Sequence, residues 1–242
     1  QGSQYPGMGQ ELYQEFPYVQ EIYNAAAEAF GFDVAKVSFE GTDQELAQTV
    51  ISQPVIYTLS LAAYEVMKHE ICKPDCAAGH SLGEYAAMTA SGILTQQDGF
   101  RVIKARAKAM EHASQQSDGA MYAIIGSNNP AIEAVCQETE GYVIPVNYNS
   151  PVQTVIAGES KSAEEAAAKL AEQGARVMKL AVSCAFHSRL MAGAAEEFRE
   201  AVKDVTFHIP EIPFYSNLDG TLRSQIDTEY LVQHLTSPVQ FV

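Results

Sequence analysis

The chain has 242 residues, 47% of them hydrophobic, so it is long and apolar enough to bury the core of a globular protein. A formal net charge of −15 argues against a nucleic-acid partner, because phosphates need a basic surface. No run reaches the roughly 18 apolar residues of a membrane span, so no membrane partner is expected. Four cysteines without C-x-x-C spacing argue against a metal site and favour a reducing compartment, the cytoplasm.

The N-terminal part of the chain predicts a loop followed by helices. The stretch from Gln1 to Gly9 is glycine-rich and reads as a loop. Gln10 to Phe30 then places apolar residues at steps of three and four, which predicts one amphipathic helix. Ser52-Gln53-Pro54 predicts the start of a further helix, with Ser52 as N-cap and Pro54 in its first turn. The largely apolar run from Val55 to Met67 would continue it.

A G-x-S-x-G pentapeptide, Gly79-His80-Ser81-Leu82-Gly83, is typical of a nucleophile elbow between a strand and a helix. Ser81 is the candidate nucleophile. Because the pattern occurs by chance in roughly one such chain in ten, its context must support it. Apolar residues at Cys76 to Ala78 predict a strand end before it, and Glu84 to Ala90 predict a helix after it.

Arg106 lies on the apolar side of a predicted helix from Asp98 to Glu111, whereas the other cations of that helix lie on the opposite face. A buried arginine needs a partner, and no acidic residue stands one turn away on its own face. Its planar guanidinium suits a carboxylate ligand, which it can grip with two parallel hydrogen bonds. The alternative is an internal salt bridge to a distant Asp or Glu.

The segment from Ala120 to Val182 predicts the order βαββαβ, which is a ferredoxin-like arrangement. Asn147 to Pro151 would form its central turn, with the asparagines serving turn geometry first and substrate contact second. The elements are expected at Met121–Ile125, Pro130–Glu138, Tyr142–Asn147, Thr154–Gly158, Ser160–Gln173 and Arg176–Val182.

Five separated segments together resemble the malonyl-CoA:acyl carrier protein transacylase family. They are Gln1-Gly2-Ser3-Gln4, Gly79 to Tyr85, Arg106 to Met110, Asn147 to Gly158 and Ala185-Phe186-His187-Ser188. The resemblance implies an α/β fold with an α/β-hydrolase-like core, residues 1–117 and 184–242, and an inserted ferredoxin-like subdomain, residues 118–183, acting as a lid. It also implies that the chain lacks an N-terminal strand and a C-terminal segment of the family.

The resemblance assigns roles to individual residues. Ser81 would be the nucleophile and His187 its base, oriented by the backbone carbonyl of Gln240 rather than by an aspartate. Arg106 would bind the malonyl carboxylate. The remaining expected site residues are Gln1 and Leu82, whose backbone amides would hold the oxyanion, and Gln53, His80 and Asn149, which would contact the substrate.

The implied activity is transfer of a malonyl group from coenzyme A to the phosphopantetheine thiol of acyl carrier protein, through a Ser81 acyl-enzyme in a ping-pong route. No cofactor or metal is needed, and a monomer serving fatty-acid biosynthesis is expected. Because carrier proteins are usually acidic, a local basic rim would help docking. Its candidates, which could equally be solvated surface charges, are Lys161, Lys169, Arg176, Lys179 and Arg189.

Other functions remain open at this point. An acyltransferase or acyl hydrolase of a polyketide synthase shares the same motifs, although a hydrolase would be expected to lack Arg106. An α/β-hydrolase-type esterase or thioesterase would use the order Ser, Asp, His, which Ser81, Asp204 or Asp219, and His234 could satisfy. A non-catalytic scaffold would need neither nucleophile nor base.

Overall fold

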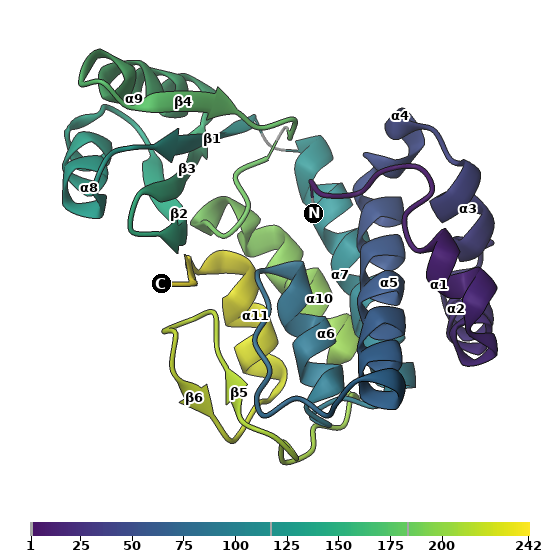
Figure 1. Ribbon diagram of the computed structural model, residues 1–242. Helices are drawn as coiled ribbons and strands as arrows, with labels where there is room; N and C mark the ends of the chain where they lie inside the picture. The colour runs from purple at the N-terminus through teal and green to yellow at the C-terminus, as the bar shows by residue number, and fades with distance from the viewer. Residues whose placement is uncertain (1, 117, 183) are drawn as a thin grey trace. The chain divides into compact units, whose positions relative to one another are not determined.

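The computed structural model describes residues 2–116, 118–182 and 184–242, and confirms the mixed α/β class (Figure 1). Its contacts divide the chain into two compact units. The first unit comprises Gln1–Glu111, Ala201–Tyr215 and Leu222–Asp227, and the second comprises His112–Glu200, Ser216–Thr221 and Thr228–Val242. None of the helices in the described ranges is long and apolar enough to cross a membrane.

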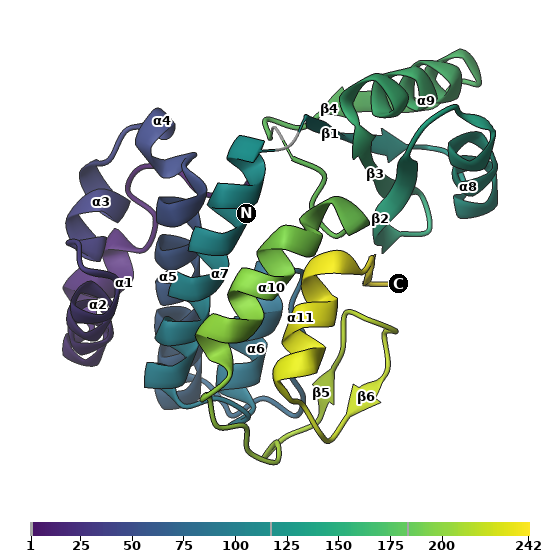
Figure 2. The same cartoon turned by 180° about the vertical axis from the view of Figure 1, so that it is seen from behind.

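The first unit is mainly helical, and α5 is central to it. The apolar faces of α2 and α6 pack on α5, and α5, α6 and α7 lie side by side in Figures 1 and 2. Buried residues such as Val19, Tyr57 and Met88 form this core. The helices are α1 (Gln10–Glu15), α2 (Pro17–Phe30), α3 (Val34–Glu40), α4 (Asp43–Leu46), α5 (Thr49–Glu70), α6 (Leu82–Ala90) and α7 (Gln96–Gln116), which continues into the second unit.

Prolines account for two differences from the predicted helices. The expected helix from Gln10 to Phe30 is broken at Phe16, which is extended because it precedes a proline, and α2 begins with Pro17 at its first position. The predicted start at Ser52 is wrong. Helix α5 begins at Thr49, so Pro54 lies inside it and deprives only the Val50 carbonyl of a helical partner. The free energy gained by burying this helix outweighs the cost of that lost hydrogen bond.

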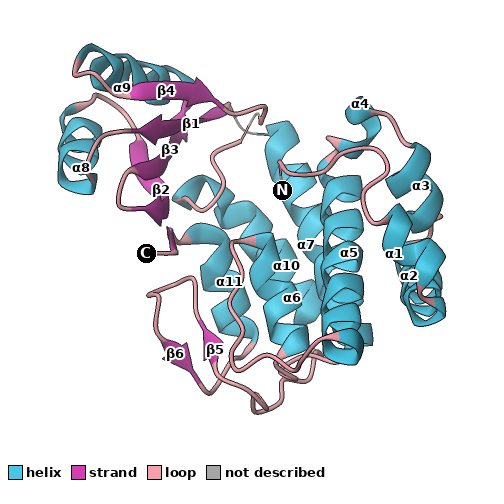
Figure 3. Ribbon diagram, in the orientation of Figure 1, coloured by secondary structure: helices cyan, strands magenta, loops and turns pink. Residues whose placement is uncertain are grey.

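Strands are scarce in the described part of the first unit (Figure 3). The strand expected at Cys76 to Ala78 is reduced to one parallel bridge, in which the Ala77 amide donates to the Pro213 carbonyl at 2.8 Å and Ala77 accepts from Tyr215 at 3.0 Å. The only ladder there joins β5 (Phe214–Tyr215) to β6 (Leu222–Arg223). The elbow therefore follows a single bridged residue rather than a long strand.

The second unit contains the predicted βαββαβ order. Its sheet has the strand order β4-β1-β3-β2-β7, in which the first four strands are antiparallel and β7 pairs parallel with β2. Helices α8 and α9 cover one face, with Ile132 and Leu170 buried against Ile124. The elements are β1 (Gly119–Ile125), α8 (Asn129–Glu138), β2 (Val143–Ser150), β3 (Gln153–Glu159), α9 (Ser160–Glu172) and β4 (Arg176–Lys179).

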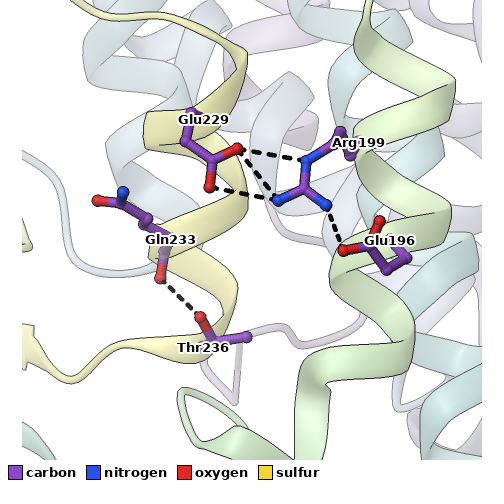
Figure 4. A network of polar contacts seen from close by, with 5 residues as sticks. All are labelled: Glu196, Arg199, Glu229, Gln233 and Thr236. Atoms are coloured by element: carbon purple, nitrogen blue, oxygen red, sulfur yellow. Dashed lines mark hydrogen bonds and ion pairs between the residues drawn. The ribbon is translucent and has the colours of Figure 1, made fainter.

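The rest of the second unit follows β4 and contains a 3-10 turn, η1 (Arg189–Met191), helices α10 (Ala192–Val202) and α11 (Thr228–Thr236), and β7 (Val239–Gln240). Arg199 of α10 joins α10 to α11 by donating to Glu229, and it also contacts Glu196 on its own helix (Figure 4). The proposed functional division into residues 1–117 with 184–242 and residues 118–183 stays a prediction.

The asparagine segment is not the turn that its sequence predicted. Asn147 and Asn149 lie within β2, where the ladder to β3 shifts register on both sides of Asn147 and Tyr148. The turn consists of Pro151 and Val152. These turn-forming residues can lie in a strand because the register shifts accommodate their irregular backbone. Asn147 is 6% exposed, so it is buried within the sheet.

Candidate active site

Ser81 sits at a backbone conformation that few residues adopt, with φ 51° and ψ −107°, immediately before α6. Such strain persists at functional sites when the surroundings enforce it. Gly79 is required here, because a Cβ on it would lie 2.1 Å from the Gly83 carbonyl carbon and oxygen. Gly83 itself has open space at the Cβ position. The close approach that forms the elbow therefore depends on the first glycine of the pentapeptide.

Arg106 is 1% exposed and reaches Ser81 from α7. Its Nη2 donates to Ser81 Oγ at 3.3 Å, and its Nη1 donates to Gln53 Oε1 at 2.6 Å. The Gln53 amide nitrogen in turn donates to the Met110 sulfur at 3.3 Å, which fixes the amide oxygen toward the guanidinium. Gln53 therefore contacts the arginine rather than the serine.

No carboxylate among the described residues forms an ion pair with Arg106, so the predicted alternative of an internal salt bridge finds no support there. Instead its guanidinium lies over the Tyr85 ring, 5.1 Å from Cζ to the ring centroid. Burial raises the pKa of the Tyr85 hydroxyl to about 12, although the Arg106 charge opposes part of the rise. Arg106 Nε is buried and donates to no described residue. The charge is thus compensated by neutral groups and retains a donor for an anion.

The start of α6 provides an amide for an oxyanion. Gly83 and Glu84 donate their backbone N–H groups to the carbonyls of His80 and Ser81, at 2.9 and 3.1 Å. The Leu82 amide has no backbone acceptor among the described residues, as is usual in the first turn of a helix. His80 is exposed, and its contact with a substrate stays a prediction. The predicted role of Gln1 lies outside the described residues.

His187 is 4% exposed, in the second unit, and adopts a positive φ of 59°. Its Nδ1 lies 3.0 Å from the backbone carbonyl oxygen of His234. Because a carbonyl only accepts, Nδ1 must carry the proton, which leaves Nε2 as the basic nitrogen of the neutral ring. The two imidazoles also contact each other edge to face, with centroids 5.3 Å apart.

The carbonyl expected to orient His187 was that of Gln240, and this role stays a prediction, although Nδ1 of His187 contacts the His234 carbonyl in the structure. Gln240 belongs to β7, where its amide donates to the Asn217 carbonyl at 2.7 Å. His234 lies in the last turn of α11, where carbonyls lack helical partners. Its partner would be the residue four positions on, but that residue is Pro238, which has no N–H. The spacing of His234 and Pro238 is the sequence signal that reveals this acceptor.

Another predicted site residue, Asn149, lies in the second unit. Asn149 is half-buried in the bulged part of β2, so its substrate contact stays a prediction. The two aspartates of the alternative triad contact other side chains. Asp204 Oδ2 lies 3.9 Å from Arg101 Nη2, and Asp219 Oδ1 accepts from the backbone and hydroxyl of Thr221.

A serine at a strained elbow, within hydrogen-bond distance of a buried arginine, fits an enzyme that forms an acyl-serine intermediate, as acyl transferases do. The sequence model of the acyl transferase domain matches residues 1–242, so the chain belongs to that family. Within it, the chain belongs with the malonyl CoA-acyl carrier protein transacylases.

One such relative, from Haemophilus influenzae, is 41% identical over the whole chain, which covers 80% of that relative. The transacylase structure from Coxiella burnetii is 32% identical, with a TM-score of 0.95 over all of this chain and 78% of its own. A malonyl transacylase solved with a type II polyketide acyl carrier protein is 35% identical, with a TM-score of 0.93 over all of this chain and 80% of that one.

Proposed function

We propose that this protein transfers a malonyl group from coenzyme A to the phosphopantetheine thiol of an acyl carrier protein, as a malonyl-CoA:acyl carrier protein S-malonyltransferase. Proteins named as malonyl transacylases are similar to this chain over its whole length, which supports this activity. The observation that carries the proposal is the Arg106 guanidinium, buried without a described carboxylate partner and 3.3 Å from Ser81 Oγ. A serine esterase that acts on neutral acyl groups would not need a buried positive charge beside its nucleophile.

The first half-reaction forms the acyl-enzyme. Ser81 Oγ attacks the thioester carbon while His187 Nε2 accepts its proton, and the carbonyl oxygen becomes an oxyanion held by the amides of Leu82 and Gln1. The C–S bond then breaks, and His187 returns the proton to the sulfur of coenzyme A. The pairing of Ser81 with His187 rests on the family resemblance.

The second half-reaction reverses these steps with a new thiol. The carrier's phosphopantetheine thiol gives its proton to His187 and attacks the Ser81 ester, and the serine leaves with that proton. A neutral carbonyl supports the imidazole less than an aspartate would, which suffices because thiolate is a good leaving group. Arg106 binds the malonyl carboxylate throughout, with Gln53 holding its guanidinium in place.

The proposal includes a cytoplasmic monomer that serves fatty-acid biosynthesis. A carrier of polyketide synthesis is the second candidate, because one similar transacylase was solved with such a carrier. Rates with a fatty-acid carrier and a polyketide carrier, measured at equal concentration, distinguish the two. The cytoplasmic location rests on the cysteine usage of the sequence.

Intact mass spectrometry after mixing with malonyl-CoA tests the proposal. We expect one added malonyl group in the wild type, mapped to Ser81, and none in Ser81→Ala. The control is Ser91→Ala, a buried serine at the other end of α6 that donates to the Met88 carbonyl, which should still be labelled. Undiminished labelling of Ser81→Ala would reject Ser81 as the nucleophile.

A further inference from the structure

The five cations expected to form a basic rim do not form one cluster. Lys169 pairs with Glu165 at 2.8 Å. Arg176 and Lys179 are three residues apart on β4, so their side chains point to opposite faces of the sheet. Lys179 also lies over the Tyr122 ring, on the face that carries the helices. Arg189 differs from these because of how it is held.

Arg189 is exposed, but an aromatic ring holds its side chain in place. Its Cζ lies 3.9 Å from the centroid of the Tyr142 ring, and its own backbone N–H donates to the Tyr142 hydroxyl at 3.2 Å. One tyrosine thus holds both the main chain and the guanidinium of the same residue. Stacking covers one face of the guanidinium and leaves its N–H edge available, which reduces the entropy lost when an anion binds.

The segment that carries Arg189 also carries His187. Ser188 fixes the turn between them, because its hydroxyl donates to the Ala185 carbonyl at 2.6 Å and accepts from the Leu190 amide at 3.2 Å. Arg189 lies two positions after His187, so their Cα atoms lie within roughly 7 Å. The same fixed turn therefore carries both the imidazole and this cation.

Arg189 has no ion-pair partner among the described residues, in a chain whose acidic residues outnumber its basic ones by 30 to 15. Arg101, Lys169 and Arg199 pair with carboxylates, whereas Arg176 and Lys179, like Arg189, form no ion pair with a described residue. A net charge of −15 repels anionic substrates at long range, so a local cation is needed where they bind. Arg189 is available for that role.

We propose that Arg189 binds the phosphate of the phosphopantetheine arm. This inference rests on the proposed function, in which malonyl-CoA and the carrier protein both bring that arm to His187. The malonyl carboxylate is assigned to Arg106, so the phosphate is the other anionic group that both substrates share. The planar fork of an arginine matches phosphate oxygens with paired hydrogen bonds.

Calorimetric titration with phosphopantetheine and with pantetheine tests the proposal without requiring turnover. In the wild type, the phosphate should tighten binding about tenfold, the gain expected of a charge-assisted hydrogen bond. Arg189→Gln should abolish that difference, and Tyr142→Leu should reduce it. Arg199→Gln is the matched control, because this half-buried arginine of the same unit donates to Glu196 and Glu229.

Three outcomes overturn the proposal. The first two are a phosphate that brings no gain in the wild type and a gain that survives in Arg189→Gln. The third is an equal weakening of phosphopantetheine and pantetheine binding by Arg189→Gln, which would make the residue structural. Titration with holo-carrier protein separates the sources, since a loss seen only there would mean that Arg189 binds the carrier's own surface. Failure of Ser81 labelling, in contrast, would count against the proposed function alone.

Discussion

Arg106 is compensated in an unusual way for a buried charge. Its neighbours are an amide oxygen, a hydroxyl and an aromatic ring, contributed by Gln53, Ser81 and Tyr85. Neutral groups satisfy hydrogen bonds but leave the desolvation cost of the cation largely unopposed. A substrate carboxylate would offset that cost, so binding energy is concentrated at the acid group of the acyl chain.

Replacing Arg106 should therefore change substrate preference rather than activity in general. In Arg106→Ala, kcat/KM for malonyl-CoA should fall about 10- to 100-fold, the loss of one charged hydrogen bond or more, while acetyl-CoA is spared. Arg101→Ala, an exposed arginine of the same helix, is the control and should change neither rate. Equal losses for both substrates in a folded Arg106→Ala protein would assign the residue a structural role.

The two glycines of the elbow should respond differently to the same substitution. Gly79→Ala places a methyl group 2.1 Å from the Gly83 backbone, which should cost about 1–3 kcal/mol of unfolding free energy and displace Ser81. Gly83→Ala meets nothing within 4 Å and lies in a helix, so it should be neutral or slightly stabilising. Urea unfolding measures both. Similar values for the two variants would show that the close approach does not limit the fold.

At the scale of elements, periodicity predicted most helices and four of the five strands of the larger sheet, β1 to β4, but not β7. The misplaced boundaries share one cause. At each of them, tertiary packing outweighed the local conformational preference of the residues. Pro54 marks a helix start by its own preference, yet the buried turn before it continues the helix. Asn147 and Ser150 favour a turn, yet cross-strand pairing with Val155 and Gln153 places them in β2.

The candidate site shows the same limit. Ser81 and Arg106 could be predicted because motifs and helical faces are local, whereas Gln53 came from the family resemblance; in the structure both Ser81 and Gln53 contact Arg106. The carbonyl that orients His187 could not be identified from residue type, since every residue has a carbonyl. What distinguishes the His234 carbonyl is its lack of a helical donor, which depends on Pro238 and on where α11 ends.

Pro238 can therefore be tested as the residue that keeps this carbonyl available. In Pro238→Ala, a backbone N–H at position 238 could extend α11 and compete with His187 for the His234 carbonyl. We expect acylation of Ser81 to slow by less than tenfold, because a carbonyl oxygen has two lone pairs. Pro151→Ala, in the turn between β2 and β3, is the control. An unchanged single-turnover rate in Pro238→Ala would contradict this account of α11.

At the scale of the whole molecule, both units bury groups whose pKa values rise on folding. Burial raises the pKa of Cys136 in the second unit from 9.0 to about 12, with help from Glu133. Burial likewise raises the pKa values of Tyr23, Tyr57 and Tyr85 in the first unit above 10.0. In each case the folded protein keeps a proton that the unfolded chain releases.

The consequence is a loss of stability in alkaline solution. Between about pH 9 and pH 12 the unfolded state binds fewer protons than the folded state, so the free energy of unfolding must fall as pH rises. Each fully buried group contributes at most about 1.4 kcal/mol per pH unit within its own window, and below pH 9 the curve should be flat with respect to these groups.

Urea unfolding at a series of pH values measures the slope. Tyr57→Phe should flatten it above pH 10, because Tyr57 is completely buried, whereas Tyr5→Phe, on a side chain 61% exposed, should leave it unchanged. A slope that is the same in all three proteins would show that the buried phenol ionises as readily in the folded state as in the unfolded chain.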